Sequence, residues 1–277
     1  MNYAKIVHEV IEEHNASPVA MLGVVDATGQ RAYLSNLEHS YERTVRDVGN
    51  LFENDKATRS VLEIGSFLGP VSFSLKRLGF SVCALDIPEY YESPSLRELY
   101  EKNGVPFTGV NLRRGKLPYE SSSLDVVVMC EVLEHLNFNP LPVLMEINRV
   151  LKPGGYLYIG MPNQASIANR VRLLRGRSIH NPIEDFSRQL DREHNMIVGL
   201  HWREYTEAEA VQMIERMGFE AATKYYFVEK GRAGANVLRS LLRSLAYAYP
   251  PFRPYQVVLG RKVRIPTDDF WLTDANS

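Results

Sequence analysis

The chain has 277 residues, of which 45% are hydrophobic and 23% charged, and a mean hydropathy of −0.23, so it can bury the full core of a globular protein. Its net charge of −1 excludes a protein that binds duplex nucleic acid mainly by electrostatic attraction. Only two cysteines, Cys83 and Cys130, are present, both in apolar runs, which excludes a disulfide framework.

The predicted elements begin with helices and then alternate. Apolar residues at helical spacing predict helices over 3–14 and about 37–54. From Val61 onward strand and helix signals alternate, which is typical of a parallel, doubly wound sheet. The expected strands are 60–64, 80–85, 106–110, 124–130, 156–161, 221–228 and 255–263, and the later helices are 141–151 and 207–217.

This pattern predicts an α/β fold: a doubly wound, mostly parallel seven-stranded sheet with N-terminal helices and a helical insertion before the last strand. The expected parts are an N-terminal helical extension (1–59), a core (60–228) that includes a lid-like segment (163–205), a basic amphipathic helical insertion (229–254), and the last strand with the C-terminal tail (255–277).

The turn after the first strand carries the first functional signal. Glu63 near the end of that strand is followed by Gly65 and Gly69, and Asp86 ends the next strand about twenty residues later. Glycines let a backbone approach a ligand, and an acid at the neighbouring strand tip can accept hydrogen bonds from ribose hydroxyls. The pattern predicts half of a nucleotide-cofactor site, with a plain strand-to-helix turn as the alternative.

The motifs that follow carry a resemblance to a known family. They are Glu63-x-Gly65-x-x-x-Gly69, Asp86, Leu117-Pro118-Tyr119, Leu124-Asp125-Val126-Val127, 131–136 (Glu-Val-Leu-Glu-His-Leu), 149–155 (Arg-Val-Leu-Lys-Pro-Gly-Gly) and Pro162-Asn163. As a set over about 61–228 they resemble the class I S-adenosylmethionine-dependent methyltransferases, most closely the small-molecule and glycan branch. Phe67 departs from the family, because many relatives carry glycine there. S-adenosylmethionine has no phosphates, so this departure argues more strongly against a dinucleotide site.

The resemblance implies S-adenosyl-L-methionine as the methyl donor and S-adenosyl-L-homocysteine as the product. It places Glu63 and Gly65 near the amino-acid end of the cofactor and Asp86 on the ribose. Asn111 stands where the family usually has an acid for the adenine amino group, and its oxygen can still accept; a turn role is the alternative. The expected cofactor-binding residues are Glu63, Gly65, Ser66, Gly69, Asp86, Asn111, Leu112, Cys130 and Glu131.

The chemistry of the site depends on four residues. Methyl transfer from a sulfonium is an in-line displacement, and an oxygen nucleophile benefits from a base such as His135 or His201. Glu131 and His135 would share a face if their segment were helical. Three hypotheses stay open: His135 packs and holds the loop after the fourth strand; His135 or His201 is the general base; or Glu131, Glu134, His135 and His201 bind a divalent metal. The last pattern looks like the metal-ligand segment of small-RNA terminal 2′-O-methyltransferases.

Two basic segments lie outside these motifs. Arg170, Arg172, Arg175 and Arg177 form either a solvated helix face or a grip on an anionic substrate. Residues 230–264 contain eight Lys and Arg and no Asp or Glu, with an apolar stripe over 237–249. This stripe docks on the sheet, walls the acceptor site or makes a peripheral membrane contact. We expect a cytoplasmic protein, with association at the inner membrane surface left open.

The sequence therefore predicts an enzyme that O-methylates a small molecule, sugar or lipid-linked acceptor, without duplex nucleic acid as a partner. A metal-assisted RNA 2′-O-methyltransferase is the main alternative. A non-catalytic, cofactor-binding subunit of the same fold and a nicotinamide-dependent oxidoreductase are the others. The sequence does not predict the oligomeric state.

Overall fold

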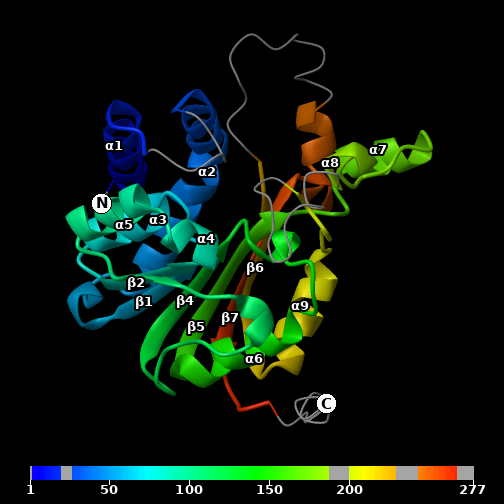
Figure 1. Ribbon diagram of the computed structural model, residues 1–277. Coiled ribbons are helices and arrows are strands. Elements are labelled where there is room, and N and C mark those ends of the chain that lie inside the picture. The colour runs from blue at the N-terminus through cyan, green and yellow to red at the C-terminus, as the bar shows by residue number, and fades with distance from the viewer. Residues whose placement is uncertain (1, 20–26, 187–199, 229–242, 267–277) are drawn as a thin grey trace.

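A computed structural model of the protein describes residues 2–19, 27–186, 200–228 and 243–266 (Figure 1). The helices are α1 (Tyr3–Ala16), α2 (Ala27–Leu51), α3 (Pro70–Arg77), α4 (Pro88–Tyr91), α5 (Pro94–Lys102), α6 (Leu141–Val150), α7 (Ile167–Leu174), α8 (Ile183–Phe186) and α9 (Glu207–Arg216). The strands are β1 (Ser60–Ile64), β2 (Ser81–Asp86), β3 (Phe107–Gly109), β4 (Leu124–Cys130), β5 (Leu151–Pro162), β6 (Phe219–Phe227) and β7 (Tyr255–Lys262).

All seven strands belong to one sheet with the order β3-β2-β1-β4-β5-β7-β6. The strands from β3 to β5 pair in parallel, and β7 lies antiparallel between β5 and β6. The predicted fold class, a mostly parallel seven-stranded α/β sheet, is therefore confirmed. β1, β2 and β3 fill one half of the sheet in succession, and the chain then returns to add β4 on the other side of β1. The strand order therefore reverses between β1 and β4. Ligands of such sheets bind at the carboxyl ends of the strands beside this reversal.

Helices cover both faces of the sheet. β4 is buried along its whole length, as its nearly continuous apolar sequence predicts. Val126 and Val128 belong to the hydrophobic cluster shared with α1, α2 and α3, whereas Val127 and Met129 belong to the one shared with α6 and α9. The alternation follows from the two-residue period of a strand. Figure 1 shows these two groups of helices on opposite sides of the sheet.

The amino ends of the central strands are joined by one buried carboxylate. Asp125 in β4 accepts hydrogen bonds from the backbone and hydroxyl of Ser60 at 3.0 and 2.9 Å and from Arg59 at 3.1 Å. Lys152 at the start of β5 adds a 2.7 Å ion pair. The motif that contains Asp125 and the motif that contains Lys152 therefore meet at the amino ends of the strands. They hold the strands together at the end of the sheet opposite the cofactor motifs.

A second family-motif residue, Arg149, holds a loop. Its guanidinium donates to the carbonyls of Leu117 and Tyr119 at 3.0 Å each, and it forms an ion pair with Glu146 at 2.8 Å. The Leu-Pro-aromatic segment is thereby fastened to the end of α6, so the sequence motif reflects a structural contact.

Some element boundaries differ from the predictions. The helix expected over 37–54 is α2, which begins ten residues earlier, at Ala27. The strand expected over 156–161 is β5, which already begins at Leu151 because that residue pairs with Leu124 before a register shift. The Pro-Gly-Gly sequence inside β5 is unfavourable in strands, so the local pattern does not show this extension.

Two predictions fall partly outside the described residues. The basic insertion 229–254 is described only from residue 243, and the lid-like segment 163–205 lacks 187–199. In the described part of the insertion, Leu245 is 64% exposed and Tyr249 is 57% exposed. No helix in the described part of the chain has the length and apolar character needed to cross a bilayer.

Candidate cofactor and acceptor site

The turn after β1 contains three residues in the left-handed region, with φ of 71° at Gly65, 42° at Phe67 and 77° at Gly69. A Cβ atom on Gly65 would lie 2.5 Å from Val132 Cγ2, and one on Gly69 would lie 2.4 Å from the Phe73 ring. Both glycines are therefore needed for backbone conformation and for space.

Phe67, the residue that departs from the family, is accommodated by aromatic packing. Its buried ring makes an edge contact with Tyr33 of α2 at 5.1 Å and a tilted contact with Tyr90 of α4 at 5.0 Å. Residues other than glycine rarely adopt a positive φ, so the backbone conformation of Phe67 costs free energy. The contacts of its ring offset that cost. The Phe67 ring thus forms part of the wall beside the turn.

Asp86 ends β2 directly beside this turn. One carboxylate oxygen accepts the Phe67 amide at 2.7 Å and the other accepts the Ile87 amide at 2.7 Å. Burial raises the pKa of Asp86 to about 6, although these two backbone hydrogen bonds lower it. Each carboxylate oxygen can accept further hydrogen bonds, so the group retains the acceptor capacity that the predicted ribose contact needs. The contact with ribose stays a prediction.

Glu63 and Ser66 have partners within the protein. The Glu63 carboxylate accepts the backbone amide of Ser72 at 2.8 Å and its hydroxyl at 2.5 Å, which ties β1 to the first turn of α3. Burial raises the pKa of Glu63 to about 8. Ser66 accepts a hydrogen bond from the Tyr100 hydroxyl at 2.7 Å. These side chains shape the turn, and their contact with the cofactor stays a prediction.

Asn111 serves the local turn. Its side-chain oxygen accepts the Arg113 amide at 3.0 Å and caps the single turn Leu112–Arg114. The preceding residue, Val110, donates its amide to the Asp86 carbonyl at 2.8 Å, so Asn111 lies near the predicted ribose site. The turn role is what the structure shows, and the adenine contact stays a prediction.

The end of β4 is covered by α2, a helix that no sequence motif connects with the site. Ser40 donates its hydroxyl to Glu131 at 3.0 Å, and Thr44 lies one turn further along and donates to the Cys130 sulfur at 3.3 Å. Burial raises the pKa of the Cys130 thiol. The sequence signal that could have identified these contacts is the spacing of Ser40 and Thr44. They are four residues apart beside the apolar stripe of α2, so they lie on one helix face.

The segment after β4 is not a continuous helix, so the condition for a shared helix face of Glu131 and His135 is not met. Glu131 has φ of 55°, and only Leu133–His135 forms a single 3₁₀ turn. The Glu131 amide instead donates to the Gly160 carbonyl of β5 at 2.8 Å. A left-handed residue directly after the strand redirects the chain before the turn can begin.

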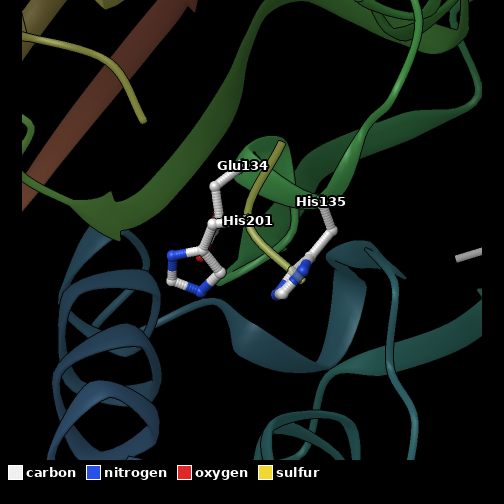
Figure 2. A group of neighbouring side chains, drawn as sticks. All are labelled: Glu134, His135 and His201. Carbon is white, nitrogen blue, oxygen red and sulfur yellow. The ribbon is translucent and has the colours of Figure 1, made fainter. Parts of the chain in front are cut away.

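This geometry brings three of the four proposed metal ligands together (Figure 2). Glu134, His135 and His201 each offer a ligand atom within 4.8 Å of the other two, whereas Glu131 lies outside this group. The backbone aligns the two segments, because the Trp202 amide donates to the Glu134 carbonyl at 2.8 Å. The His135 and His201 rings meet edge to face at 5.0 Å.

Both histidines have one ring nitrogen engaged. His135 Nδ1 lies 2.7 Å from the Leu200 carbonyl, which can only accept, so Nδ1 carries the proton in neutral His135. His201 Nδ1 lies 3.2 Å from Glu204, whose other oxygen accepts Asn169 at 2.8 Å. In each ring the remaining nitrogen, Nε2, is the one available to a proton, a metal or an acceptor.

The local electrostatics favour a neutral His135 and an uncharged Glu134. Burial, with His201 as a smaller contribution, lowers the pKa of His135 to about 4. Burial and the neighbouring Glu131 raise the pKa of Glu134 well above its usual range. His135 therefore keeps an unprotonated Nε2 at neutral pH but is a weak base. His135 is therefore better suited to position a group or to bind a metal than to carry a proton.

The arginines of 170–177 lie apart from this cluster. Arg170, Arg172, Arg175 and Arg177 are all exposed, on α7 and the turn that follows it. Arg170 also lies over the Phe252 ring at 5.4 Å, which connects α7 with the segment before β7. The structure agrees with a solvated face, and the anion-binding hypothesis stays untested.

Comparison with known proteins places the chain in a family. Residues 62–159 match the methyltransferase domain family. A probable S-adenosylmethionine-dependent methyltransferase of Mycolicibacterium smegmatis is 28% identical over 272 residues, which cover 94% of this chain and 91% of that protein. The ubiquinone biosynthesis O-methyltransferase of Xanthomonas oryzae is 32% identical over 115 residues, or 41% of this chain and 47% of the enzyme. A probable methyltransferase of Arabidopsis thaliana, PMT4, is 30% identical over 132 residues, which cover 48% of this chain but only 21% of that protein.

The solved structures support the same fold. A chain in the complex between the Haloferax volcanii Trm112 methyltransferase activator and the putative methyltransferase superposes with a TM-score of 0.55 at 15% identity, covering 92% of this chain and 98% of that one. The sheet order agrees with a Rossmann-like α/β methyltransferase fold, and the family implies S-adenosylmethionine as cofactor. The chain is a class I S-adenosylmethionine-dependent methyltransferase, and the predicted family and enzyme class are confirmed. The small-molecule and glycan branch stays a prediction.

Proposed function

We propose that this methyltransferase transfers the methyl group to a hydroxyl oxygen of a small-molecule, sugar or lipid-linked acceptor. The observation that carries the proposal is the pair His135 and His201 at the carboxyl end of β4. Their rings lie 5.0 Å apart, and the Nδ1 atom of each is directed at an oxygen acceptor. Such a fixed pair of imidazoles can orient a hydroxyl and receive its proton.

The reaction balances without another reagent. A lone pair of the acceptor oxygen forms the new O–CH₃ bond while the methyl–sulfur bond breaks. The sulfur keeps that bonding pair, so the sulfonium becomes the neutral thioether of S-adenosylhomocysteine. The hydroxyl proton passes to a base or to water. His201 is the candidate base, because the low pKa of His135, about 4, suits a hydrogen-bond acceptor better than a proton carrier.

Two further observations support the acceptor class. One relative that matches part of this chain is named as an O-methyltransferase of ubiquinone biosynthesis. Exposed apolar side chains gather on α7 and the segment before β7, with Leu174 87% exposed and Leu245 64% exposed. These surfaces support an apolar or lipid-linked acceptor, and they are the basis for proposing a peripheral membrane contact.

The test is methyl transfer from donor labelled in its methyl group to phenols, sugars, a polyprenyl-linked sugar and an RNA oligonucleotide with a free 2′-hydroxyl. We expect an O-methylated product from one of the first three classes. In the His201→Ala variant, turnover should fall while affinity for S-adenosylhomocysteine stays within about twofold. Label found only in RNA would favour the 2′-O-methyltransferase alternative. Cofactor binding without transfer to any acceptor would favour a non-catalytic subunit.

A further inference from the structure

The cluster of Glu134, His135 and His201 has the donor set of a metal centre (Figure 2). One carboxylate and two imidazoles, from the loop after β4 and the segment before α9, place a ligand atom each within 4.8 Å of the others. We propose that these three side chains bind one divalent transition-metal ion.

The two histidines are oriented as metal ligands usually are. A ligating imidazole nearly always donates its second ring N–H to a carbonyl or carboxylate, which fixes the tautomer and the ring plane. The Leu200 carbonyl, 2.7 Å from His135 Nδ1, and the Glu204 carboxylate, 3.2 Å from His201 Nδ1, are the acceptors of these second N–H groups. Glu204 is itself held by Asn169 at 2.8 Å. Glu204 is therefore a positioning residue, and both Nε2 atoms are left for the ion.

Glu134 supplies an independent indication of a cation. Its side chain is 1% exposed, and neither carboxylate oxygen accepts a hydrogen bond of ordinary geometry from another described residue, although its own backbone amide and the carboxyl group of Glu131 lie close by. A buried carboxylate is stable when it is paired or coordinates a metal. A bound ion would compensate the buried charge of Glu134, which otherwise lies beside a second carboxyl group, that of Glu131.

The donor set indicates which ions fit. Two imidazoles with one carboxylate suit zinc, manganese, cobalt or iron, whereas magnesium and calcium prefer oxygen ligands throughout. Three protein ligands also leave coordination positions open for water or for another oxygen. The structure therefore favours a transition ion with an open position over a closed structural site.

The open position gives the ion a role, which rests on the function proposed above. A hydroxyl of the acceptor bound to the ion would be held near the cofactor and would release its proton more readily. The ion then takes the place of the general base, and His201, bound to it through Nε2, acts as a ligand and not as the proton acceptor considered above. Metal binding itself requires neither cofactor nor acceptor.

Metal binding can be measured directly on the tag-free, full-length protein after treatment with a chelator. Titration with Co²⁺, followed by its visible absorption, and calorimetry with Zn²⁺, Mn²⁺ and Mg²⁺ give affinity and stoichiometry. We expect one tightly bound equivalent, with Zn²⁺ or Co²⁺ at least about tenfold tighter than Mg²⁺. His201→Ala should weaken binding at least about tenfold, and Glu204→Gln about 10–100-fold through the ring orientation.

Two variants make the experiment specific. His8→Ala is the matched control, because His8 on α1 also lies beside a carboxylate, Glu38, at 2.9 Å but outside the cluster; its removal should leave binding unchanged. Glu134→Gln keeps the side-chain shape and removes the buried charge. The metal-free variant should melt at or above the wild-type temperature, while the increase in melting temperature on adding metal should disappear.

The proposal is overturned if the wild type binds these ions no more tightly than His201→Ala and Glu134→Gln, or if binding depends equally on His8. Methyl transfer measured after complete metal removal tests the role separately. Unchanged transfer would overturn the acceptor-holding role while leaving the proposed methyl transfer intact. Loss of transfer that zinc or cobalt restores would support both.

Discussion

Lys152 and Asp125 form an ion pair, with Nζ 2.7 Å from Oδ2, across the amino ends of β5 and β4. The two residues belong to motifs separated by more than twenty residues in the sequence. Their contact shows that these motifs stabilise the sheet at the edge away from the cofactor turn. The same carboxylate also binds Ser60 and Arg59, so it fastens three neighbouring strands.

Asp125→Asn tests this network through its pH dependence. Burial raises the pKa of Asp125, but hydrogen bonds from Lys152, Ser60 and Arg59 outweigh this and lower the pKa to about 2. Since the folded-state pKa lies below the ordinary value, the stabilisation is present above about pH 4 and is lost as the pH falls toward 2. We expect the variant to lose roughly 1–2 kcal/mol of unfolding free energy at neutral pH, measured by urea titration. A difference that does not shrink in acid would contradict this account.

Gly65→Ala tests the space behind the cofactor turn, with Gly115→Ala as its matched control. Both glycines have left-handed backbones, φ 71° and 75°, but only a Cβ on Gly65 meets an atom within 4 Å, at 2.5 Å from Val132. We expect the control to lose about 1–2 kcal/mol of stability from backbone strain alone. Gly65→Ala should lose a further ~1–3 kcal/mol through overpacking. It should also lose affinity for S-adenosylhomocysteine by calorimetry, and equal losses in the two variants would argue against a crowded turn.

Asp86 should make cofactor binding pH-dependent. Burial raises its pKa to about 6, and the charged form is the better acceptor for ribose hydroxyls. Affinity for S-adenosylhomocysteine should therefore fall below pH 6, by up to about tenfold per pH unit. Asp86→Asn should bind about 1–3 kcal/mol more weakly at neutral pH. Its affinity should also vary little between pH 5 and 7, and a variant that keeps the wild-type profile would place the ribose elsewhere.

Ser40→Ala tests whether α2 supports the end of β4. The Ser40 hydroxyl is buried and donates to Glu131 at 3.0 Å, and Ser35 on the same helix is exposed. Loss of a buried hydrogen bond to a carboxylate should cost about 1–3 kcal/mol in chemical unfolding. Ser35→Ala should change stability by less than about 0.5 kcal/mol. If both variants behave alike, the contact between α2 and β4 does not contribute to stability.

Much of the fold follows from local sequence. β4 was predictable because a continuous apolar run indicates a strand covered on both faces. The start of α9 at Glu207 was predictable, because Thr206 and Glu209 have the spacing of a capping box, and the structure shows that box with the Thr206 amide 2.9 Å from Glu209. The extra length of β5 was not predictable, because its start at Leu151 depends on pairing with β4 and not on strand propensity.

The site was only partly predictable. The sequence identified His135 and His201 as candidates. It could not show whether the segment of Glu131 is helical, since the left-handed backbone of that residue accompanies its contact with β5. Glu204 and Asn169 were missed because a hydrogen bond to a histidine ring leaves no local pattern. Ser40 and Thr44 were missed because their partners, Glu131 and Cys130, lie about ninety residues away in the sequence.

The sequence by itself determined the succession of the seven strands and of the four predicted helices along the chain, the glycine turn with its following acid, and the resemblance to methyltransferases. These features depend on neighbouring residues and on hydrophobic periodicity. Only the tertiary structure decided that Glu134, His135 and His201 converge while Glu131 is held by α2. Such convergence arises when separate segments pack and desolvate their polar groups against one another, and no local spacing encodes that result.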